Sequence, residues 1–328
     1  MASTYTQESN FEHAMHHPVA DLWQTRNEGY YRSFDKTRLF WCSLTDPAHD
    51  KVIVVVNGRI ESAWKYQELF YDLFQQGYDI YAYDHRGQGL SDRLIEEREM
   101  GFVGEFNDYV QDLSGLVQMW DLSRYRQRFL LGHSMGGAVV TRYVQTHPHH
   151  DFSAMALSAP MFGVSMPWQL RPVAMPLTQF MTAFYRKPTY APGYSAYYAK
   201  PFEINPLTQS EVRYHWFREL YEQKPELKLG GPSTRWVWQG LMAAKQCIQL
   251  TRQIRIPTLV LQAEADTIVS NAAQVRFITK LARTNPASTI EVIAGARHEV
   301  LFEQDQYRNQ ALDAMLAHFA SAEQADAG

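Results

Sequence analysis

A serine lies at the centre of a glycine-rich turn, Gly132-His133-Ser134-Met135-Gly136-Gly137. The turn directly follows an apolar run, Phe129–Leu131, and opens a helical pattern that continues to Tyr143. Glycines two residues before and two after a serine permit a sharp strand-to-helix turn, which holds the serine hydroxyl out at the carboxyl edge of a sheet. The strand before it and the helix after it favour this interpretation over an ordinary glycine-rich turn. The pattern therefore predicts that Ser134 is a nucleophile.

A serine hydroxyl is a poor nucleophile unless a positioned base accepts its proton, and an acid usually orients that base. Two later segments supply candidates, because Asp266 follows the apolar run 258–262 and His298 follows the run 289–293. Polar residues just beyond the carboxyl ends of strands are typical of α/β active sites. We expect Asp266 to orient His298, and His298 to deprotonate Ser134 and later activate water. Glu264 is an alternative acid, two residues closer to its strand.

The other histidines are weaker candidates for the base. His85 and His133 lie inside motifs near the predicted site, where we expect packing or supporting roles, and His133 is also a candidate contact for substrate. Three further histidines surround Pro148 and could form a metal cluster, although a solvated helix end explains them better: His147, His149 and His150. The chemistry predicted here needs no metal and no organic cofactor.

The negative charge of a tetrahedral intermediate needs preorganised donors, which are usually backbone N–H groups. One donor should be Met135, immediately after the nucleophile. The second should come from the segment after the early apolar run, where Gly58 permits a backbone turn and Arg59 would supply its N–H. The Arg59 guanidinium could then meet an anionic group of the substrate, or it could form a salt bridge with Glu61 or Asp84.

Short apolar runs alternate with helical patterns along most of the chain, which is typical of strand–helix–strand units on a mostly parallel sheet. The expected strands are 39–44, 51–56, 78–83, 128–131, 152–157, 258–262 and 289–293. The expected helices include 64–76, ending at Gly77, and 106–120, 271–282 and 304–320, with a frayed tail after Ser321. The fold class is therefore α/β, with helices on both sides of a mostly parallel sheet.

The alternation stops between residues 161 and 235, which we interpret as a mainly helical cap inserted into a core domain of residues 1–160 and 236–328. Residues 161–200 contain nine aromatic side chains and four methionines but no Asp or Glu. Such a composition favours an adaptable apolar channel, and Phe162 and Trp168 are candidate substrate contacts. Ordinary packing inside the cap is the alternative. Helices are expected from Gln209 to Gln223 and from Ser233 toward Leu250.

The charge of the chain and its distribution narrow the range of partners that the protein could bind. The 328 residues carry a formal net charge of -4, which argues against nucleic acid as a partner. The cap carries nine basic and five acidic residues, so a basic cap covers an acidic core. Its basic residues, among them Arg171, Arg186 and Lys187, would favour a phosphate or an anionic membrane surface.

The cellular location is also constrained by the sequence. Two cysteines, Cys42 and Cys247, fit a reducing compartment, and residues 1–30 lack the pattern of a secretion signal. The uncharged run 152–170 contains two prolines and reads as a strand plus a loop rather than a membrane span. We expect a cytoplasmic protein with peripheral contact to the cytoplasmic face of the inner membrane.

Five segments together resemble the α/β-hydrolase superfamily, and within it the branch of monoacylglycerol lipases and bacterial lysophospholipases. They are Asn57–Ser62, Asp84–Ser91, Phe106–Val110, His133–Gly137 and Ala159–Gly163. The Asp84–Ser91 segment is shared by many hydrolases, whereas the Gly-Arg-Ile-Glu-Ser segment is far more specific. Many relatives carry His-Gly where this chain has Asn57-Gly58, which removes a histidine but leaves the backbone donor of Arg59.

The resemblance covers nearly the whole chain and implies hydrolysis of the single acyl ester of a lysophospholipid, with monoacylglycerols as the neighbouring substrate class. An aminopeptidase of the same fold is an alternative that would need cap carboxylates to bind an ammonium group, such as Glu203, Glu211 or Glu219. A binding protein that has lost catalysis is a third possibility, although this chain keeps a candidate for each member of the triad.

Overall fold

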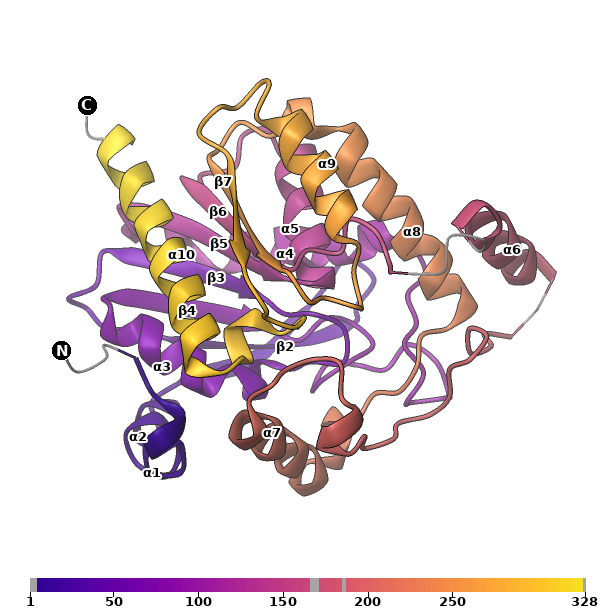
Figure 1. Ribbon diagram of the computed structural model, residues 1–328, viewed down its shortest axis with the longest axis horizontal. Helices are drawn as coiled ribbons and strands as arrows, with labels where there is room; N and C mark the ends of the chain where they lie inside the picture. Colours follow the sequence, from indigo (N-terminus) through magenta and orange to yellow (C-terminus); the bar gives the residue numbers. More distant parts are fainter. Residues whose placement is uncertain (1–4, 166–170, 185–186, 327–328) are drawn as a thin grey trace.

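A central eight-stranded sheet organises the chain, as the ribbon of the computed structural model shows (Figure 1). The structure describes residues 5–165, 171–184 and 187–326. The spatial order of the strands is β1-β2-β4-β3-β5-β6-β7-β8. Their bounds are β1 Asn27–Arg32, β2 Arg38–Leu44, β3 Lys51–Val56, β4 Tyr78–Tyr83, β5 Gln127–His133, β6 Ala154–Ser158, β7 Thr258–Ala263 and β8 Thr289–Ile293.

The mostly parallel sheet predicted from the sequence is confirmed. From β4 to β8 in the spatial order, all neighbouring strands pair in parallel, while β1 and β2 form an antiparallel edge. The β-branched run of β3 is buried along almost its whole length, as expected for a strand covered on both faces. Strand β1 was not predicted, because its sequence, Asn-Glu-Gly-Tyr-Tyr-Arg, is polar and largely exposed at the sheet edge.

Helices cover both faces of the sheet. One face carries α4 Phe106–Trp120, α5 Met135–Thr146, α8 Thr234–Gln249 and α9 Asn271–Leu281, which share one apolar core. The other face carries α2 Pro18–Gln24, α3 Gln67–Gln75 and α10 Asp305–Asp326 around a second core. The short helix α1, Phe11–His16, precedes α2. Because the two cores hold the sheet rigid between them, the loops at the carboxyl ends of the strands are built on a fixed frame.

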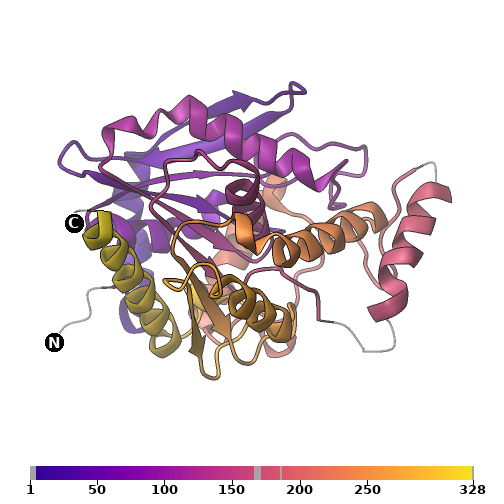
Figure 2. The same ribbon diagram turned by 90° about the horizontal axis from the view of Figure 1, so that it is seen from above.

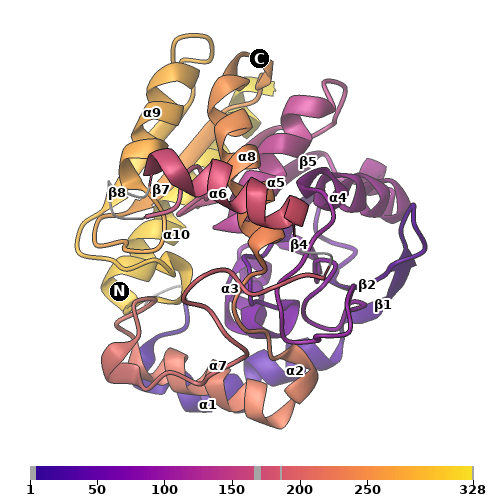
Figure 3. The ribbon, with the colours of Figure 1, turned by 90° about the vertical axis from the view of Figure 1, so that its right-hand side faces the viewer.

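The segment between β6 and α8 contains two longer helices, α6 Arg171–Phe184 and α7 Glu211–Gln223, and no strand within the residues described. Helices α6 and α7 lie well apart (Figures 1 and 3). Helix α6 packs on α8 and projects at one end of the molecule (Figure 2). Helix α7 is tied to the core by Arg213, whose buried guanidinium pairs with Glu68 of α3 and Asp305 of α10. The two cap helices are thus anchored in different ways.

The C-terminal tail differs from the prediction. Residues after Ser321 were expected to fray, but α10 continues to Asp326. Ala322 is buried, and Glu323 forms ion pairs with Lys51 and Arg126 at 3.4 and 3.8 Å. These contacts stabilise the last turn of the helix. The small and polar residues of this segment gave no indication of that turn.

Candidate active site

The backbone at Ser134 adopts a rare conformation between β5 and α5. Its φ of 51° and ψ of -115° fall outside the regions that L-residues usually occupy. Flanking glycines make this turn possible: a Cβ at Gly132 would lie 2.8 Å from the Gly137 Cα, and one at Gly136 would overlap the carbonyl oxygen of Val56. The turn therefore has the geometry expected from the sequence, and the side chain of Ser134 leaves the end of β5 toward the loops after β7 and β8.

Three side chains from three loops form a continuous hydrogen-bonded chain. Ser134 Oγ lies 3.0 Å from His298 Nε2, and His298 Nδ1 lies 2.7 Å from Asp266 Oδ2. Since a carboxylate can only accept, Nδ1 carries the proton, which leaves Nε2 to accept from the serine hydroxyl. The structure thus brings together the three residues that the sequence singled out.

Asp266 is fixed in its ionised form. Its Oδ1 accepts the backbone N–H groups of Ile268 and Val269 at 2.7 and 3.0 Å. Burial alone would raise the pKa of Asp266, but the bond to His298 and the two N–H donors outweigh burial and lower the pKa below its usual value. Glu264, the alternative acid, instead accepts the backbone N–H of Gly295 at 2.9 Å.

His85 and His133 are buried beside the site and are held neutral. Burial lowers the pKa of each to about 4. His85 Nε2 donates to the carbonyl oxygen of Asn57 at 3.0 Å, and His133 Nδ1 donates to that of Ser158 at 3.2 Å. The ring of His133 lies 5.1 Å from that of His298. Both histidines thus bond to backbone carbonyls of segments around Ser134, and a contact of His133 with substrate stays a prediction.

The loop after β3 is bonded from several sides. Gln88 Nε2 donates to the carbonyl oxygens of Gly58 and Glu61, both at 2.8 Å, and Glu61 Oε2 accepts the N–H of Gly58 at 2.6 Å. Ile60 has a φ of 68°, which is rare for a β-branched residue, and its carbonyl accepts the Tyr221 hydroxyl at 2.8 Å. Asn57 Nδ2 donates to the carbonyl of Tyr83 at 3.1 Å.

These bonds fix the peptide that carries the predicted Arg59 donor. Met135 is the first residue of α5, and the first N–H groups of a helix have no partner within the helix. The backbone of Gly136 also lies against the carbonyl oxygens of Val56 and Asn57, so the start of α5 and the loop after β3 are adjacent. The arrangement suits two N–H donors that converge on one oxygen.

The side chain of Arg59 makes neither of the salt bridges considered from the sequence. Its Nη1 donates to the carbonyl oxygen of Gly230 at 2.8 Å, and its guanidinium lies over the ring of Trp236. Within the residues described, it has no ion pair with a carboxylate. Asp84 is occupied elsewhere, accepting from Ser62, Ala63 and Leu90. The side chain of Arg59 is partly exposed, and its partial desolvation lowers its pKa to about 10, so the guanidinium remains charged at neutral pH.

The predicted aromatic contacts are only partly described. Phe162 is 2% exposed and stacks on Phe277 with ring centroids 4.1 Å apart, so its ring belongs to the core beneath the cap. A direct contact of Phe162 with substrate stays a prediction. Trp168 lies outside the described residues. No three His, Cys, Asp or Glu side chains within the described ranges are grouped to hold a metal, and His147 bonds to the carbonyl of Tyr143.

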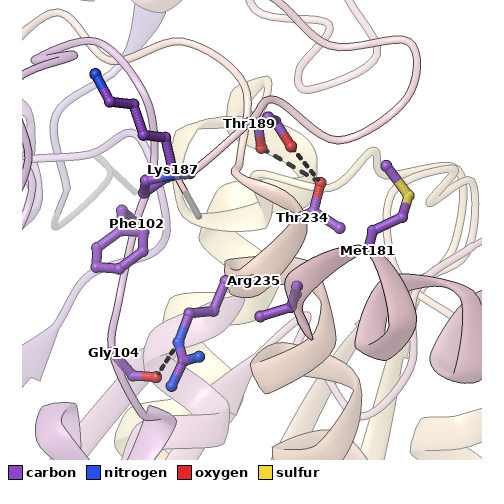
Figure 4. Close-up of a pocket in the computed structure, with 9 residues that line it drawn as sticks. Phe102, Gly104, Met181, Lys187, Thr189, Thr234 and Arg235 are labelled. Atoms are coloured by element: carbon purple, nitrogen blue, oxygen red, sulfur yellow. Dashed lines mark hydrogen bonds between the residues drawn. The ribbon is translucent and has the colours of Figure 1, made fainter. Parts of the chain in front are cut away.

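A pocket of about 410 Å³ lies between the end of α6 and the start of α8 (Figure 4). Its wall combines apolar side chains, Phe102 and Met181, with two basic ones, Lys187 and Arg235. Arg235 Nε donates to the carbonyl of Gly104 at 2.7 Å. Phe102 and Gly104 come from the core, so the pocket lies between the core and residues 161–235, and Ser134 does not line it.

Three charged side chains behind the site were not assigned a supporting role from the sequence. They are Glu61, Lys65 and Glu299, all of which are buried. The i,i+4 spacing of Glu61 and Lys65 was the one available signal. Glu299 could have been suspected only as the neighbour of His298.

Residues 47–305 match the family described as "Serine aminopeptidase, S33". The chain is 37% identical to lysophospholipase L2 of Escherichia coli (strain K12) over 96% of this chain and 93% of that protein. The chain belongs to this family of α/β-hydrolases. This hydrolase is also 36% identical to the probable lysophospholipase L2 of Haemophilus influenzae, over 83% of this chain and 84% of that one.

Solved structures agree with the fold of this hydrolase. A soluble variant of monoglyceride lipase from Saccharomyces cerevisiae, in complex with a substrate analogue, superposes with a TM-score of 0.70. The two chains are 18% identical, and the match covers 91% of this chain and 97% of that one. The monoacylglycerol lipase of Paleococcus ferrophilus gives a TM-score of 0.68 at 18% identity, and the match covers 86% of this chain and 98% of that one. These likenesses establish the α/β-hydrolase fold expected from the sequence.

Proposed function

We propose that this protein is a serine hydrolase that cleaves the acyl ester of lysophospholipids, releasing a fatty acid and a glycerophosphodiester. The observation that carries the proposal is the hydrogen-bonded chain from Ser134 through His298 to Asp266, at 3.0 and 2.7 Å. Near-full-length similarity to proteins named lysophospholipase L2 supports the substrate class.

In the acylation step, Ser134 Oγ attacks the ester carbonyl carbon while His298 Nε2 takes the hydroxyl proton. The carbonyl oxygen becomes an oxyanion that accepts hydrogen bonds from the backbone N–H groups of Met135 and Arg59. When the intermediate collapses, the bond between the carbonyl carbon and the glycerol oxygen breaks. His298 returns its proton to that oxygen, and an acyl-Ser134 ester remains.

Deacylation reverses the same proton path with water as the nucleophile. His298 Nε2 takes a proton from water, and the resulting hydroxide attacks the acyl carbon. Collapse of the second intermediate releases the fatty acid and returns the proton to Ser134 Oγ. In both steps Asp266 stabilises the imidazolium through Nδ1 without itself taking up a proton, consistent with its lowered pKa.

The Arg59 guanidinium supplies the recognition of a phosphate in this proposal. It is a partly exposed cation that lacks a carboxylate partner among the described residues, and it is attached to the backbone that provides an oxyanion donor. Arginine binds phosphate through several charge-assisted hydrogen bonds. A lysophospholipid places its phosphate a few bonds from its acyl ester, so one residue serves both groups.

An outer face of α6 supports a second proposal, that the cap contacts lipid surfaces. Leu177, Phe180 and Phe184 are 47%, 58% and 71% exposed, and they recur at helical spacing. Phe180 and Phe184 pack on each other with ring centroids 4.3 Å apart. We refer to these three residues as the α6 apolar face. Helix α6 lies in the stretch without acidic residues, near the exposed Lys187, which suits an anionic interface. None of the helices described is long and apolar enough to cross a bilayer.

The aminopeptidase alternative has weaker support, although the matching family carries that description. It needs a carboxylate beside the site to bind a substrate ammonium group. Glu203, Glu211 and Glu219 are all exposed, and Glu211 and Glu219 lie near partners on their own helix, His215 and Gln223. Monoacylglycerol hydrolysis remains the neighbouring activity, since it uses the same ester chemistry without the phosphate.

A substrate panel tests the proposed class. We expect the purified protein to hydrolyse lysophosphatidylethanolamine with a higher kcat/KM than monoacylglycerol with the same acyl chain, and to leave aminoacyl naphthylamides intact. Fatty-acid release and naphthylamine fluorescence give the two rates. Cleavage of the naphthylamides without action on lysophosphatidylethanolamine would reverse the assignment.

A further inference from the structure

A buried lysine lies between two carboxylates behind the proposed active site. Lys65 is 2% exposed, and its Nζ lies 2.8 Å from Glu61 Oε1 and 2.7 Å from Glu299 Oε1. Glu61 belongs to the loop that carries Arg59, while Glu299 directly follows His298. One ammonium group therefore joins the segment with the oxyanion donor to the segment with the base.

Glu61 in turn shapes the loop around Arg59. Its Oε2 accepts the Gly58 N–H and the Tyr66 hydroxyl, each at 2.6 Å. The first bond closes a short ring over Ile60, whose φ of 68° a β-branched residue does not adopt readily. The carboxylate therefore compensates for an unfavourable backbone conformation, and that conformation sets the direction of the neighbouring Arg59 N–H.

We propose that Lys65 is a positioning residue for ester hydrolysis, holding the oxyanion loop and the His298 segment in register through Glu61 and Glu299. The inference rests on the proposed function, because it assigns Lys65 an effect on the oxyanion site of that reaction. Lys65 acts through Glu61 and need not touch the substrate.

The charge of Lys65, and not only its volume, is required. Burial alone would raise the pKa of Glu61, but Lys65 and other neighbours lower it to about 2, so the carboxylate is a full acceptor at every working pH. Among the described residues, the titratable groups around this carboxylate are Lys65, Tyr66, His85, His133 and Tyr221, with Glu299 on the other side of the Lys65 ammonium. Lys65 is the one permanent cation among them, since burial lowers the pKa values of His85 and His133 to about 4.

Loss of that cation has a defined consequence. Two buried carboxylates would then lie near each other without compensation, which raises the pKa of Glu61 and favours its uptake of a proton. A protonated Glu61 accepts the Gly58 N–H less strongly, so the loop relaxes from the left-handed conformation at Ile60. The Arg59 N–H then loses its alignment with the developing oxyanion.

A structural role alone makes a different prediction. The Lys65 ammonium lies 4.4 Å from the ring centroid of Phe217 and 4.5 Å from that of Phe302, so it also packs between the cap and the core. If packing were its only role, substitution would lower the free energy of unfolding but leave the kinetics of the folded fraction unchanged.

The test compares Lys65→Met with Lys51→Met, which removes a lysine from an ion pair with Glu323 on the opposite end of the sheet. With a short-chain ester, we expect Lys65→Met to lower kcat by about 10- to 100-fold with little change in KM, as for a displaced transition-state donor. The kcat of Lys65→Met should also fall as the pH is lowered, because Glu61 takes up a proton in this variant. The pH profile of the wild type should lack this additional decrease, or limb. Lys51→Met should match the wild type.

The double variant Lys65→Met, Glu61→Gln identifies the titrating group, because the extra limb should disappear with the Glu61 carboxylate. If Lys65→Met does not fold, Glu61→Gln takes its place in the test. This variant keeps the volume of the side chain but removes the carboxylate through which Lys65 acts, so we expect it to lower kcat as well. Wild-type kcat and pH dependence in the folded variants would overturn the role of Lys65. Reaction of Ser134 with a fluorophosphonate separates the two claims: a wild type that does not react contradicts the proposed function itself.

Discussion

At the scale of single residues, Arg59 combines two roles in the proposed reaction. Its backbone N–H is held by the bonds around Gly58 and Glu61, and its guanidinium is held by the carbonyl of Gly230 and the ring of Trp236. These contacts fix both groups before any substrate binds. Preorganisation of this kind is what makes donors effective in the transition state.

Arg59→Met separates the two roles, because the backbone N–H remains while the charge is lost. We expect kcat/KM for lysophosphatidylethanolamine to fall about 10- to 100-fold, the range expected for lost hydrogen bonds to a charged group. Hydrolysis of a monoacylglycerol with the same acyl chain should change little, since it has no phosphate. Equal losses on both substrates, measured by fatty-acid release, would contradict phosphate recognition by Arg59.

The residues that sequence reasoning identified share a local signal. Ser134 is marked by glycines at fixed spacing, and Asp266 and His298 each follow an apolar strand. Lys65 has no such mark, because its contact with Glu299 joins residues more than 200 positions apart. Contacts of that kind depend on the tertiary fold, so only the structure assigns Lys65 a place beside the site.

At the scale of elements, strands were easier to predict than the helices of the cap. Buried parallel strands read as continuous β-branched runs, as β3 does. Strands β3, β4 and β8 were predicted with their observed bounds, although β8 is an edge strand and largely exposed. Helix α6 was not predicted as a helix, since Pro176 lies within it, and three of its apolar residues, Leu177, Phe180 and Phe184, are exposed. The exposure of these apolar side chains is also the observation that supports the proposed contact of α6 with lipid.

Substitution of the α6 apolar face tests that role. We expect Phe180→Ser with Phe184→Ser to lower the partition onto phosphatidylethanolamine–phosphatidylglycerol vesicles at least about tenfold, because each ring would otherwise bury apolar area in the interface. Co-sedimentation gives the partition. Tyr30→Ser is a matched control, because Tyr30 is 52% exposed but lies on β1 at the sheet edge. Vesicle binding that is equal in all three proteins would exclude α6 as the contact.

At the scale of the whole molecule, the net charge of -4 conceals an uneven distribution. Residues 161–235 carry +4 and the remainder carries -8. The structure adds that the cap is held unevenly: α7 is fixed by the buried Arg213, whereas α6 packs on α8 with an apolar face exposed. The sequence indicated the basic cap, but the different anchoring of its two helices depends on long-range ion pairs that no local pattern encodes.

The central claim is that Ser134 forms the acyl intermediate in lysophospholipid hydrolysis. Its most direct test is turnover of lysophosphatidylethanolamine by the wild type, by Ser134→Ala and by the control Ser321→Ala on the exposed part of α10. We predict a loss of at least about 1,000-fold in kcat for Ser134→Ala, because the nucleophile is gone, and no loss for Ser321→Ala. Wild-type turnover by folded Ser134→Ala would contradict the account.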